Sequence, residues 1–288
     1  MVSIGVSGLI RRLLPKRLRM PYYLALSGGI IVISIAILSL IAPILTEYDP
    51  TESVAEPLLP PSLKHPLGTN NLGYDMYSRI LYGGRTVLYI VFLSTTISMV
   101  FGVTLGLISG YYGGIKDRIL TLVMDSIYSF PDVILAIAIS IALGPGIYNA
   151  AIAIAVVYIP TYFRMVRGQA LVLREQGYVI AARMMGAGDW IIMVRHILPN
   201  LLPVVVVVFT LNVTDAILTE AALSFLGLGV VPPTPDWGYD LRAGQTYLPS
   251  GYWWLVTFPG IMIMLLVVGF SLIGEGLNDI LNPRISRR

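Results

Sequence analysis

The side chains in this sequence that can do chemistry are a few carboxylates and one carboxamide set among long apolar stretches. They are Asp125, Asp132, Asn212, Asp215 and Glu220. Carboxylates are costly at membrane depth, so they usually face a bundle interior or a wet cavity and often mark a transport route. The five residues are therefore pathway candidates, although a structural pairing or a position near the membrane surface would explain each of them as well.

No arrangement for covalent or metal-assisted catalysis accompanies these residues. The chain has no cysteine, and its two histidines, His65 and His196, fall in loops that the topology below places on opposite sides of the membrane. A His-centred catalytic site, a two-His metal site and a thiolate site are therefore not expected. The phosphate-binding loop G-x-x-x-x-G-K-[ST] is also missing, so we expect no catalytic residue, no cofactor and no ATP hydrolysis in this chain.

The elements that must position the carboxylates are membrane-spanning helices. Hydrophobic residues make up 56% of the 288 positions and charged residues only 12%, which is not the composition of a soluble domain. A helix of about 20 apolar residues crosses a bilayer with its backbone groups satisfied. Three charge-free stretches, the turn signal at 144–146 that divides a fourth apolar region, and the valine run after 201 together predict an all-α membrane protein with six spans. The spans lie at roughly 22–45, 86–110, 118–143, 147–167, 201–225 and 253–275.

Positive charge predicts how these spans are oriented. Most of the 19 Lys and Arg residues lie on one side, in the terminal tails and in the segments that follow the second and fourth spans. Short loops rich in Lys and Arg stay in the cytoplasm, so we expect both termini there, and the net charge of +3 needs no nucleic-acid partner. The predicted parts are a basic tail (1–21), a first span (22–45), an outer loop (46–85), a five-span core (86–280) with an inner loop (168–200), and a tail (281–288).

Local patterns add detail outside and between the spans. Leu72, Met76 and Ile80 recur at helical spacing, which predicts an amphipathic helix in the outer loop. Pro131 is expected to kink the third span. The second outer loop, 226–252, is rich in proline and glycine and is expected to lack regular structure. Trp237 lies in this loop, and Trp253 and Trp254 follow it directly. We expect the three tryptophans to form an aromatic belt at the membrane surface.

Glycines on the second span predict close helix packing. Gly102, Gly106 and Gly110 are spaced four apart, and such a stripe of small residues lets another helix approach closely. The pattern does not identify that helix, which belongs either to this chain or to a second subunit.

The inner loop 168–200 is longer than a connection between neighbouring helices requires. Within it, "YVIAARMMGAGDWIIMVRHILPN" indicates two short helices hinged at Gly186, where glycine permits a sharp turn. Flexible methionines around the hinge suit a partner surface, and packing back onto the bundle is the alternative. The residues expected to dock are Ala181, Ala182, Met184, Met185, Gly186, Ala187 and Asp189.

The same segment resembles the Glu-Ala-Ala loop of inner-membrane permeases of ATP-binding-cassette (ABC) importers. Its matching residues are Ala181, Ala182, Gly186, Leu198 and Pro199. The motifs "HPLGTNNLGYD", "SRILYGGR", "GYYGG", "FRMVRGQALVLRE", "TEAALSFLGLG" and "LNPR" are similar to the dipeptide, oligopeptide and nickel subgroup, specifically its second (C-type) permease. The glutamate of the family motif falls on Ile180, so a salt bridge to a partner is not available at that position.

This resemblance implies a type I importer permease with a cytoplasmic coupling-helix hairpin seated in a groove of an ATPase. The implied partners are a second permease, two ATPase subunits that bind ATP and Mg²⁺, an extracytoplasmic solute-binding protein and membrane lipid. The chain would form half of a translocation pore in a prokaryotic inner membrane. Di- or oligopeptides are the implied substrates, with nickel chelates or oligosaccharides as alternatives.

Two other classes of protein compete with this interpretation. A self-sufficient proton-coupled transporter would relay protons through Asp125, Asp132, Asp215 and Glu220. Such a carrier has no need of the hairpin, and the sequence shows no evident internal repeat joining two halves. An intramembrane hydrolase would require a nucleophile and a base, and no plausible pair is present.

Overall fold

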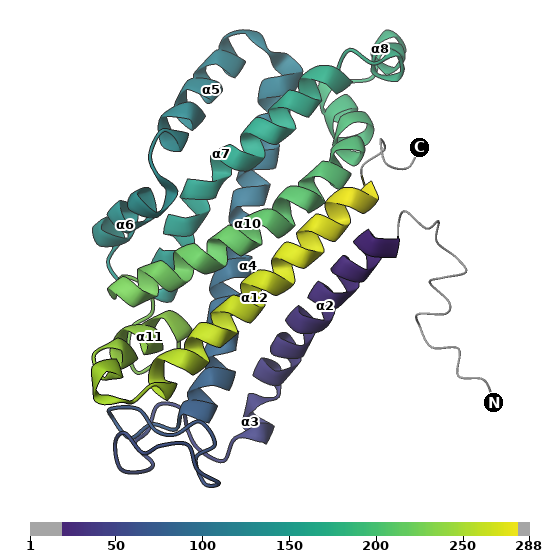
Figure 1. Cartoon of the computed structure of the whole chain (residues 1–288). Helices are drawn as coiled ribbons and strands as arrows, with labels where there is room; N and C mark the ends of the chain where they lie inside the picture. Colours follow the sequence, from purple (N-terminus) through teal and green to yellow (C-terminus); the bar gives the residue numbers. More distant parts are fainter. Residues whose placement is uncertain (1–18, 282–288) are drawn as a thin grey trace, which may run out of the picture.

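The computed structural model describes residues 19–281, so the two predicted tails lie almost wholly outside the described part. Those residues form helices and loops, without a β-strand among them (Figure 1). The helices are α2 (Arg19–Leu40), α3 (Ala42–Leu45), α4 (Met76–Tyr112), α5 (Gly114–Tyr128), α6 (Asp132–Leu143), α7 (Ile147–Leu173), α8 (Gly177–Met184), α9 (Asp189–Ile191), the π-helical segment η2 (Ile192–Ile197), α10 (Leu198–Leu226), α11 (Trp237–Gln245), the 3₁₀ turn η3 (Leu248–Ser250) and α12 (Trp254–Leu281).

Within this part, five helical stretches are long and apolar enough to cross a membrane. They contain α2, α4, α7, α10 and α12, and the bent pair α5–α6 makes a sixth span if its halves are taken together. The predicted α-helical membrane fold is confirmed, and the predicted number of six spans is reached when the bent pair is counted as one span. We call the end of the bundle with α8 and α9 the hairpin end, and the opposite end, with residues 46–75 and α11, the loop end (Figure 1).

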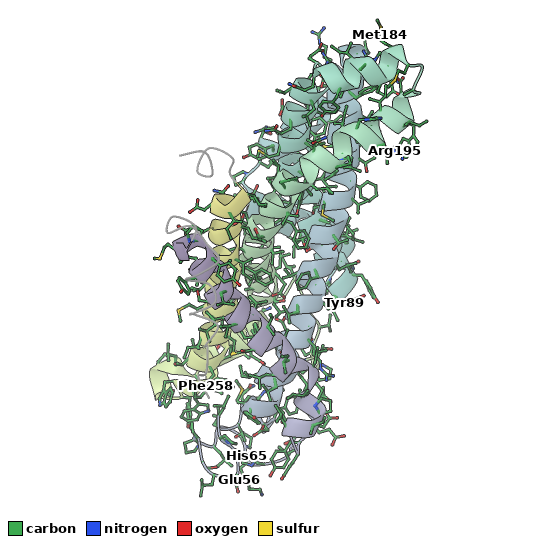
Figure 2. The ribbon with its side chains drawn as sticks, turned by 90° about the vertical axis from the view of Figure 1, so that its right-hand side faces the viewer. Glu56, His65, Tyr89, Met184, Arg195 and Phe258 are labelled. Atoms are coloured by element: carbon green, nitrogen blue, oxygen red, sulfur yellow. The ribbon has the colours of Figure 1, made fainter. Side chains whose placement is uncertain are left out.

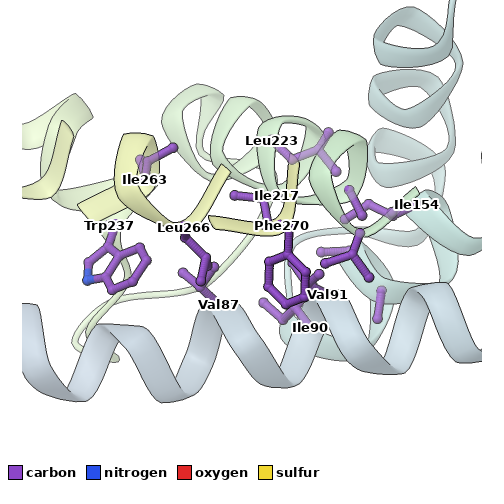
Figure 3. Packing of buried hydrophobic residues seen from close by; sticks show 14 of the residues in the cluster. Val87, Ile90, Val91, Ile154, Ile217, Leu223, Trp237, Ile263, Leu266 and Phe270 are labelled. Carbon is purple, nitrogen blue, oxygen red and sulfur yellow. The ribbon is translucent and has the colours of Figure 1, made fainter. Parts of the chain in front are cut away.

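The core of the bundle lies between α4, α7, α10 and α12, with α11 closing it at the loop end (Figure 3). The glycine stripe on α4 packs against α7 of the same chain. A Cβ atom added at Gly102 would lie 2.5 Å from the Cβ of Tyr162 and 2.7 Å from the carbonyl oxygen of Ile159. Both are too close for real atoms, so the small residues set the distance between these two helices, as the spacing predicts.

The outer loop does not contain the separate amphipathic helix that we expected. Met76 begins α4, and the side chain of Asp75 caps that helix by accepting a hydrogen bond from the Ser78 backbone N–H. Met76 and Ile80 are buried, as is Arg79 between them, while Leu72 lies outside the helix and is half exposed. The helical spacing was real, but these turns are covered by other protein elements and continue directly into the second span.

The third span is broken rather than kinked. α5 ends at Tyr128, α6 begins at Asp132, and their axes differ by 92°. Proline lacks a backbone N–H and disfavours helical geometry in the residue before it, so Phe130 and Pro131 together end one helix and start another. The break falls in the middle of the sequence predicted to cross the membrane.

The second outer loop contains regular structure, so the prediction that it lacks any is wrong. α11 is started by Asp236, whose side chain accepts a hydrogen bond from the Tyr239 backbone N–H, a common N-cap arrangement. Trp237 is fully buried and donates its indole N–H to the carbonyl of Ile80 at 2.9 Å. The aromatic-belt interpretation is wrong for Trp237 and for the buried Trp254, because their rings pack into protein.

Candidate coupling hairpin and pathway residues

The inner loop folds into the two-helix hairpin that the sequence predicts. α8 forms the first arm, and α9 with η2 forms the second arm, which continues into α10 without a break. Gly186 has a φ of 84°, a left-handed conformation that glycine adopts without strain. The backbone N–H groups of Met185, Gly186 and Ala187 all donate to carbonyls of the last turn of α8, which closes that helix.

One face of the hairpin is anchored on the bundle. Val179 and Ala182 of α8, together with Ile192 of η2, are buried against α4, α7 and α10. The hydroxyl of Tyr111 in α4 donates to the carboxylate of Asp189 at 2.6 Å. Of the predicted docking residues, Ala182 therefore lies on the anchored face, and Asp189 already has a partner within the chain.

The opposite face of the hairpin is apolar and open. Met184, which lies at the end of the bundle (Figure 2), is 85% exposed. Met185 and Trp190 of the same hairpin are 82% and 67% exposed. Ile180, at the position of the family's glutamate, is 46% exposed. Clusters of large exposed apolar side chains on the polar part of a protein mark interaction sites. Trp190 was not among the predicted docking residues, and its signal was an aromatic side chain four positions after Gly186.

The structure separates the five pathway candidates into two groups. Asp125 forms an exposed ion pair with Arg164 at 2.8 Å. Asn212 is buried, and Glu220 is buried and accepts a hydrogen bond from the Ser224 hydroxyl at 2.9 Å. These three side chains are therefore occupied by ion pairing or by burial within the chain and are not presented to an open path.

Asp132 and Asp215 differ from the other three because both are exposed on the surface of the bundle and neither forms an ion pair with another described residue. Asp132 begins α6, directly after the break, and Asp215 lies in the middle of α10. The two helices that carry these carboxylates, α6 and α10, are in contact with each other. Residues 129–131 of the break are exposed as well, so two carboxylates and an interrupted helix lie open in the apolar part of the bundle.

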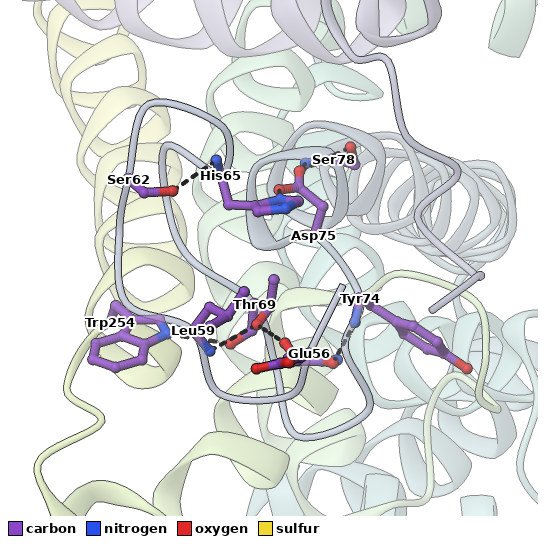
Figure 4. A network of polar contacts seen from close by, with 10 residues as sticks. Glu56, Leu59, Ser62, His65, Thr69, Tyr74, Asp75, Ser78 and Trp254 are labelled. Carbon is purple, nitrogen blue, oxygen red and sulfur yellow. Dashed lines mark hydrogen bonds and ion pairs between the residues drawn. The ribbon is translucent and has the colours of Figure 1, made fainter. Parts of the chain in front are cut away.

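The loop end is held together by buried polar contacts. His65 and Asp75 form a buried pair at 2.9 Å (Figure 4). The Thr69 hydroxyl donates to the Glu56 carbonyl and accepts from the Leu59 backbone N–H, and the Thr69 carbonyl accepts from the indole N–H of Trp254. His65 is therefore part of the folded loop. In the described part of the chain, no three His, Cys, Asp or Glu side chains are placed to hold a metal ion.

A second buried contact at the loop end joins elements that are far apart in sequence. The guanidinium of Arg79 in α4 pairs with the carboxylate of Asp240 in α11 at 2.8 Å. It also donates to the carbonyls of Pro50 and Pro233. Burial raises the pKa of Asp240 to about 6, and the charge of Arg79 opposes this rise. Nothing in the local sequence around Arg79 indicated this pair.

Sequence comparison agrees with the motifs. The family model described as "Binding-protein-dependent transport system inner membrane component" matches residues 102–287. The dipeptide transport system permease DppC of Alkalihalophilus pseudofirmus is 43% identical over 263 residues, which cover 91% of this chain and 86% of that protein. The glutathione transport system permease GsiD of Pectobacterium atrosepticum is 40% identical over 268 residues, covering 91% and 88%.

Structural comparison gives the same fold. An inward-facing structure of the MetNI methionine ABC transporter aligns with a TM-score of 0.58 at 21% identity, and the alignment covers 72% of this chain and 98% of that one. The family resemblance seen in the motifs is confirmed, and the chain belongs to the binding-protein-dependent transport system inner membrane components, the permeases of ABC importers.

Proposed function

We propose that this chain is one of two permease subunits of an ATP-driven peptide importer, and that its hairpin couples it to a cytoplasmic ATPase. The observation that carries the proposal is a hairpin anchored on one face and openly apolar on the other. A chain with no phosphate-binding loop must take energy from elsewhere. Relatives that transport dipeptides and glutathione support a peptide substrate.

Each end of the bundle would bind a different partner protein. The hairpin end faces the cytoplasm, because the Lys and Arg residues gather there, and it meets one of two ATPase subunits that bind ATP and Mg²⁺. The loop end faces outward, towards a solute-binding protein. With Ile180 exposed in place of the family's glutamate, the contact to the ATPase is apolar at this position and Met184, Met185 and Trp190 extend it.

Movement of the hairpin reaches the centre of the bundle through α10. The second arm of the hairpin runs into α10 without a turn, so a displacement by the ATPase is passed to a helix that extends to the loop end. Asp215 lies on that helix. Rigid-body movement of packed helices is a common way to alternate access to a central path.

The test of the proposed assembly begins with the native membrane. An affinity tag on the chain, extraction in mild detergent and mass spectrometry should identify ATPase subunits and a second permease in fixed proportion to the chain. Substituting both Met184 and Met185 with Asp should remove the ATPase and leave the second permease bound. A chain that emerges alone, even after crosslinking in the membrane, would contradict the proposal.

We further propose that Asp132 and Asp215 line the translocation path. Both are exposed at membrane depth, where a carboxylate is tolerated only beside water or protein. The non-helical backbone between α5 and α6 is likewise tolerated at that depth only where it lies against protein or lines a water-filled cavity. A proton relay through all four carboxylates is not favoured, since Asp125 is held in an exposed ion pair with Arg164 and Glu220 is buried. No observation favours the secondary transporter.

Because the chain has no native cysteine, single cysteines can test this path directly. In the intact complex, Asp132→Cys and Asp215→Cys should react with a water-soluble maleimide at least about tenfold faster than Ile30→Cys and Ile33→Cys, since thiolate forms only where water reaches it. Those two isoleucines are each 59% exposed in the middle of the apolar helix α2. Equal rates for the aspartate and isoleucine positions would show that Asp132 and Asp215 do not face water.

A further inference from the structure

Three carboxyl groups are buried together at the loop end, where α4, α10 and α11 meet. Glu220 is 1% exposed, Asp236 is fully buried and Asp240 is 3% exposed. The charged group of opposite sign that faces them is Arg79, which is itself 1% exposed. Three carboxylates and one guanidinium would leave two uncompensated negative charges inside the protein, at a high cost in free energy.

Arg79 is committed to only one of the three carboxyls. Its Nε and Nη2 atoms both lie 2.8 Å from Oδ1 of Asp240, and its Nη1 donates to the carbonyls of Pro50 and Pro233. Asp240 is thus the carboxyl that stays ionised beside the cation. Glu220 and Asp236 receive no ion-pair contact from Arg79 and must be neutralised in another way.

Glu220 and Asp236 are each satisfied on one oxygen only. Oε1 of Glu220 accepts from the Ser224 hydroxyl at 2.9 Å, and Oδ1 of Asp236 accepts from the Tyr239 backbone N–H at 2.9 Å. The remaining oxygens, Oε2 of Glu220 and Oδ2 of Asp236, are buried without a donor. The start of α11 lies directly on the turn of α10 that carries Glu220, since a Cβ added at Gly238 would lie 2.6 Å from the Ala221 carbonyl oxygen and 2.8 Å from the Ser224 Cβ, and each of the two carboxyls acts on the ionisation of the other. A single proton held between them would satisfy both oxygens and remove one of the two excess charges.

We propose that Glu220 and Asp236 share one proton in the folded protein, so that the acid form of one donates to the carboxylate of the other. This bond ties the start of α11 to α10. The burial that raises the pKa of Asp236 favours such sharing, because two close carboxyls in a dry site do not both ionise. Glu220 and Asp236 are positioning residues that hold the loop end closed.

The shared proton makes the closed loop end sensitive to pH. Free carboxyls lose their protons at about pH 4, whereas the buried pair keeps one at higher pH. The closed arrangement therefore binds more protons than an arrangement in which α11 has moved away and water reaches both groups. Its contribution to stability is present at low pH and is lost as the pH rises through the titration of the pair. Any effect of this pH dependence on transport rests on the proposed function, whereas the presence of the shared proton does not.

Infrared spectroscopy on the full chain in lipid nanodiscs tests the shared proton. At about pH 8, above the pKa of about 6 for Asp240, the wild type should show a carbonyl band of a protonated carboxyl that shifts in D₂O. Glu220→Gln and Asp236→Asn should each abolish the band, because the amide replaces the acid as donor. Asp125→Asn, which changes an exposed carboxyl, should leave it unchanged.

Thermal unfolding provides the second measurement. Glu220→Gln retains a donor and should unfold close to the wild type, whereas Glu220→Ala should unfold at a clearly lower temperature. The melting temperature of the wild type should fall more steeply with rising pH than that of Glu220→Gln. Absence of the infrared band, or a band that survives both variants, would overturn the proposal. Because these readouts need no partner, such a result would leave the proposed coupling function untouched.

Discussion

Replacing Gly186 with valine is expected to reduce peptide transport about tenfold while the permease still folds and assembles. Gly186 has a φ of 84°, and a Cβ added there would meet nothing within 4 Å. The substitution therefore causes no clash, and its cost is that of forcing a β-branched residue into a left-handed conformation, about 1–3 kcal/mol. A penalty of about 1.4 kcal/mol lowers the population of the native hinge about tenfold.

The measurement is uptake of a labelled dipeptide by the complete complex in liposomes, recorded together with ATP hydrolysis. We expect hydrolysis to continue and uptake to fall, because the hinge no longer passes movement of the ATPase to α10. Gly188→Val is the matched control, since Gly188 has a φ of −66° in extended backbone and also has open space around it. If Gly186→Val and Gly188→Val transport equally well, the hinge does not carry the coupling.

Replacing Arg79 with methionine is expected to destabilise the chain by about 3–5 kcal/mol, because one partner of a buried ion pair is left behind. The carboxylate of Asp240 would lose its cation, and the carbonyls of Pro50 and Pro233 would lose a donor. The measurement is thermal or denaturant unfolding of the purified chain in detergent. Arg164→Met is the control, since its pair with Asp125 is about half exposed and should contribute about 1 kcal/mol or less.

The loss of folding stability caused by Arg79→Met should depend on pH. Burial already raises the pKa of Asp240 to about 6, and Arg79 opposes the rise, so without Arg79 the pKa of Asp240 moves higher still. Below that pKa the carboxyl is neutral and the buried charge disappears, so the destabilisation should be smaller near pH 5 than near pH 8. Arg79→Met combined with Asp240→Leu should recover part of the stability at pH 8. A loss that is independent of pH would show that Asp240 is not the group responsible.

The number and order of the spans could be predicted because a long apolar stretch has few alternatives to crossing the membrane. The hinge at Gly186 was equally accessible, since a glycine between two short apolar helices is a local signal. The burial of Trp237 could not be predicted from the local sequence. Its indole N–H meets the carbonyl of Ile80, 157 positions earlier in the chain, and aromatic residues beside a span are otherwise typical of the membrane surface.

Pathway residues could be proposed from the sequence but not ranked. A carboxylate in an apolar stretch gives the same signal whether it is enclosed, ion-paired or open to a path. Asp125 was separated from Asp215 only by the position of Arg164, which lies 39 residues away on another helix. The pair of Arg79 and Asp240 was missed for the same reason, because its partners are 161 residues apart.

The right-angle break between α5 and α6 bears on how the protein is inserted during synthesis. With 15 and 12 residues, the two halves are about 22 and 18 Å long at about 1.5 Å per residue. Both are shorter than the roughly 30 Å of hydrocarbon that a span must cross. Neither half can leave the translocon for lipid by itself, and the exposed turn between them would enter the bilayer uncovered. α7 is the next helix made and packs against both halves, so α5, α6 and α7 must partition into the membrane as one unit.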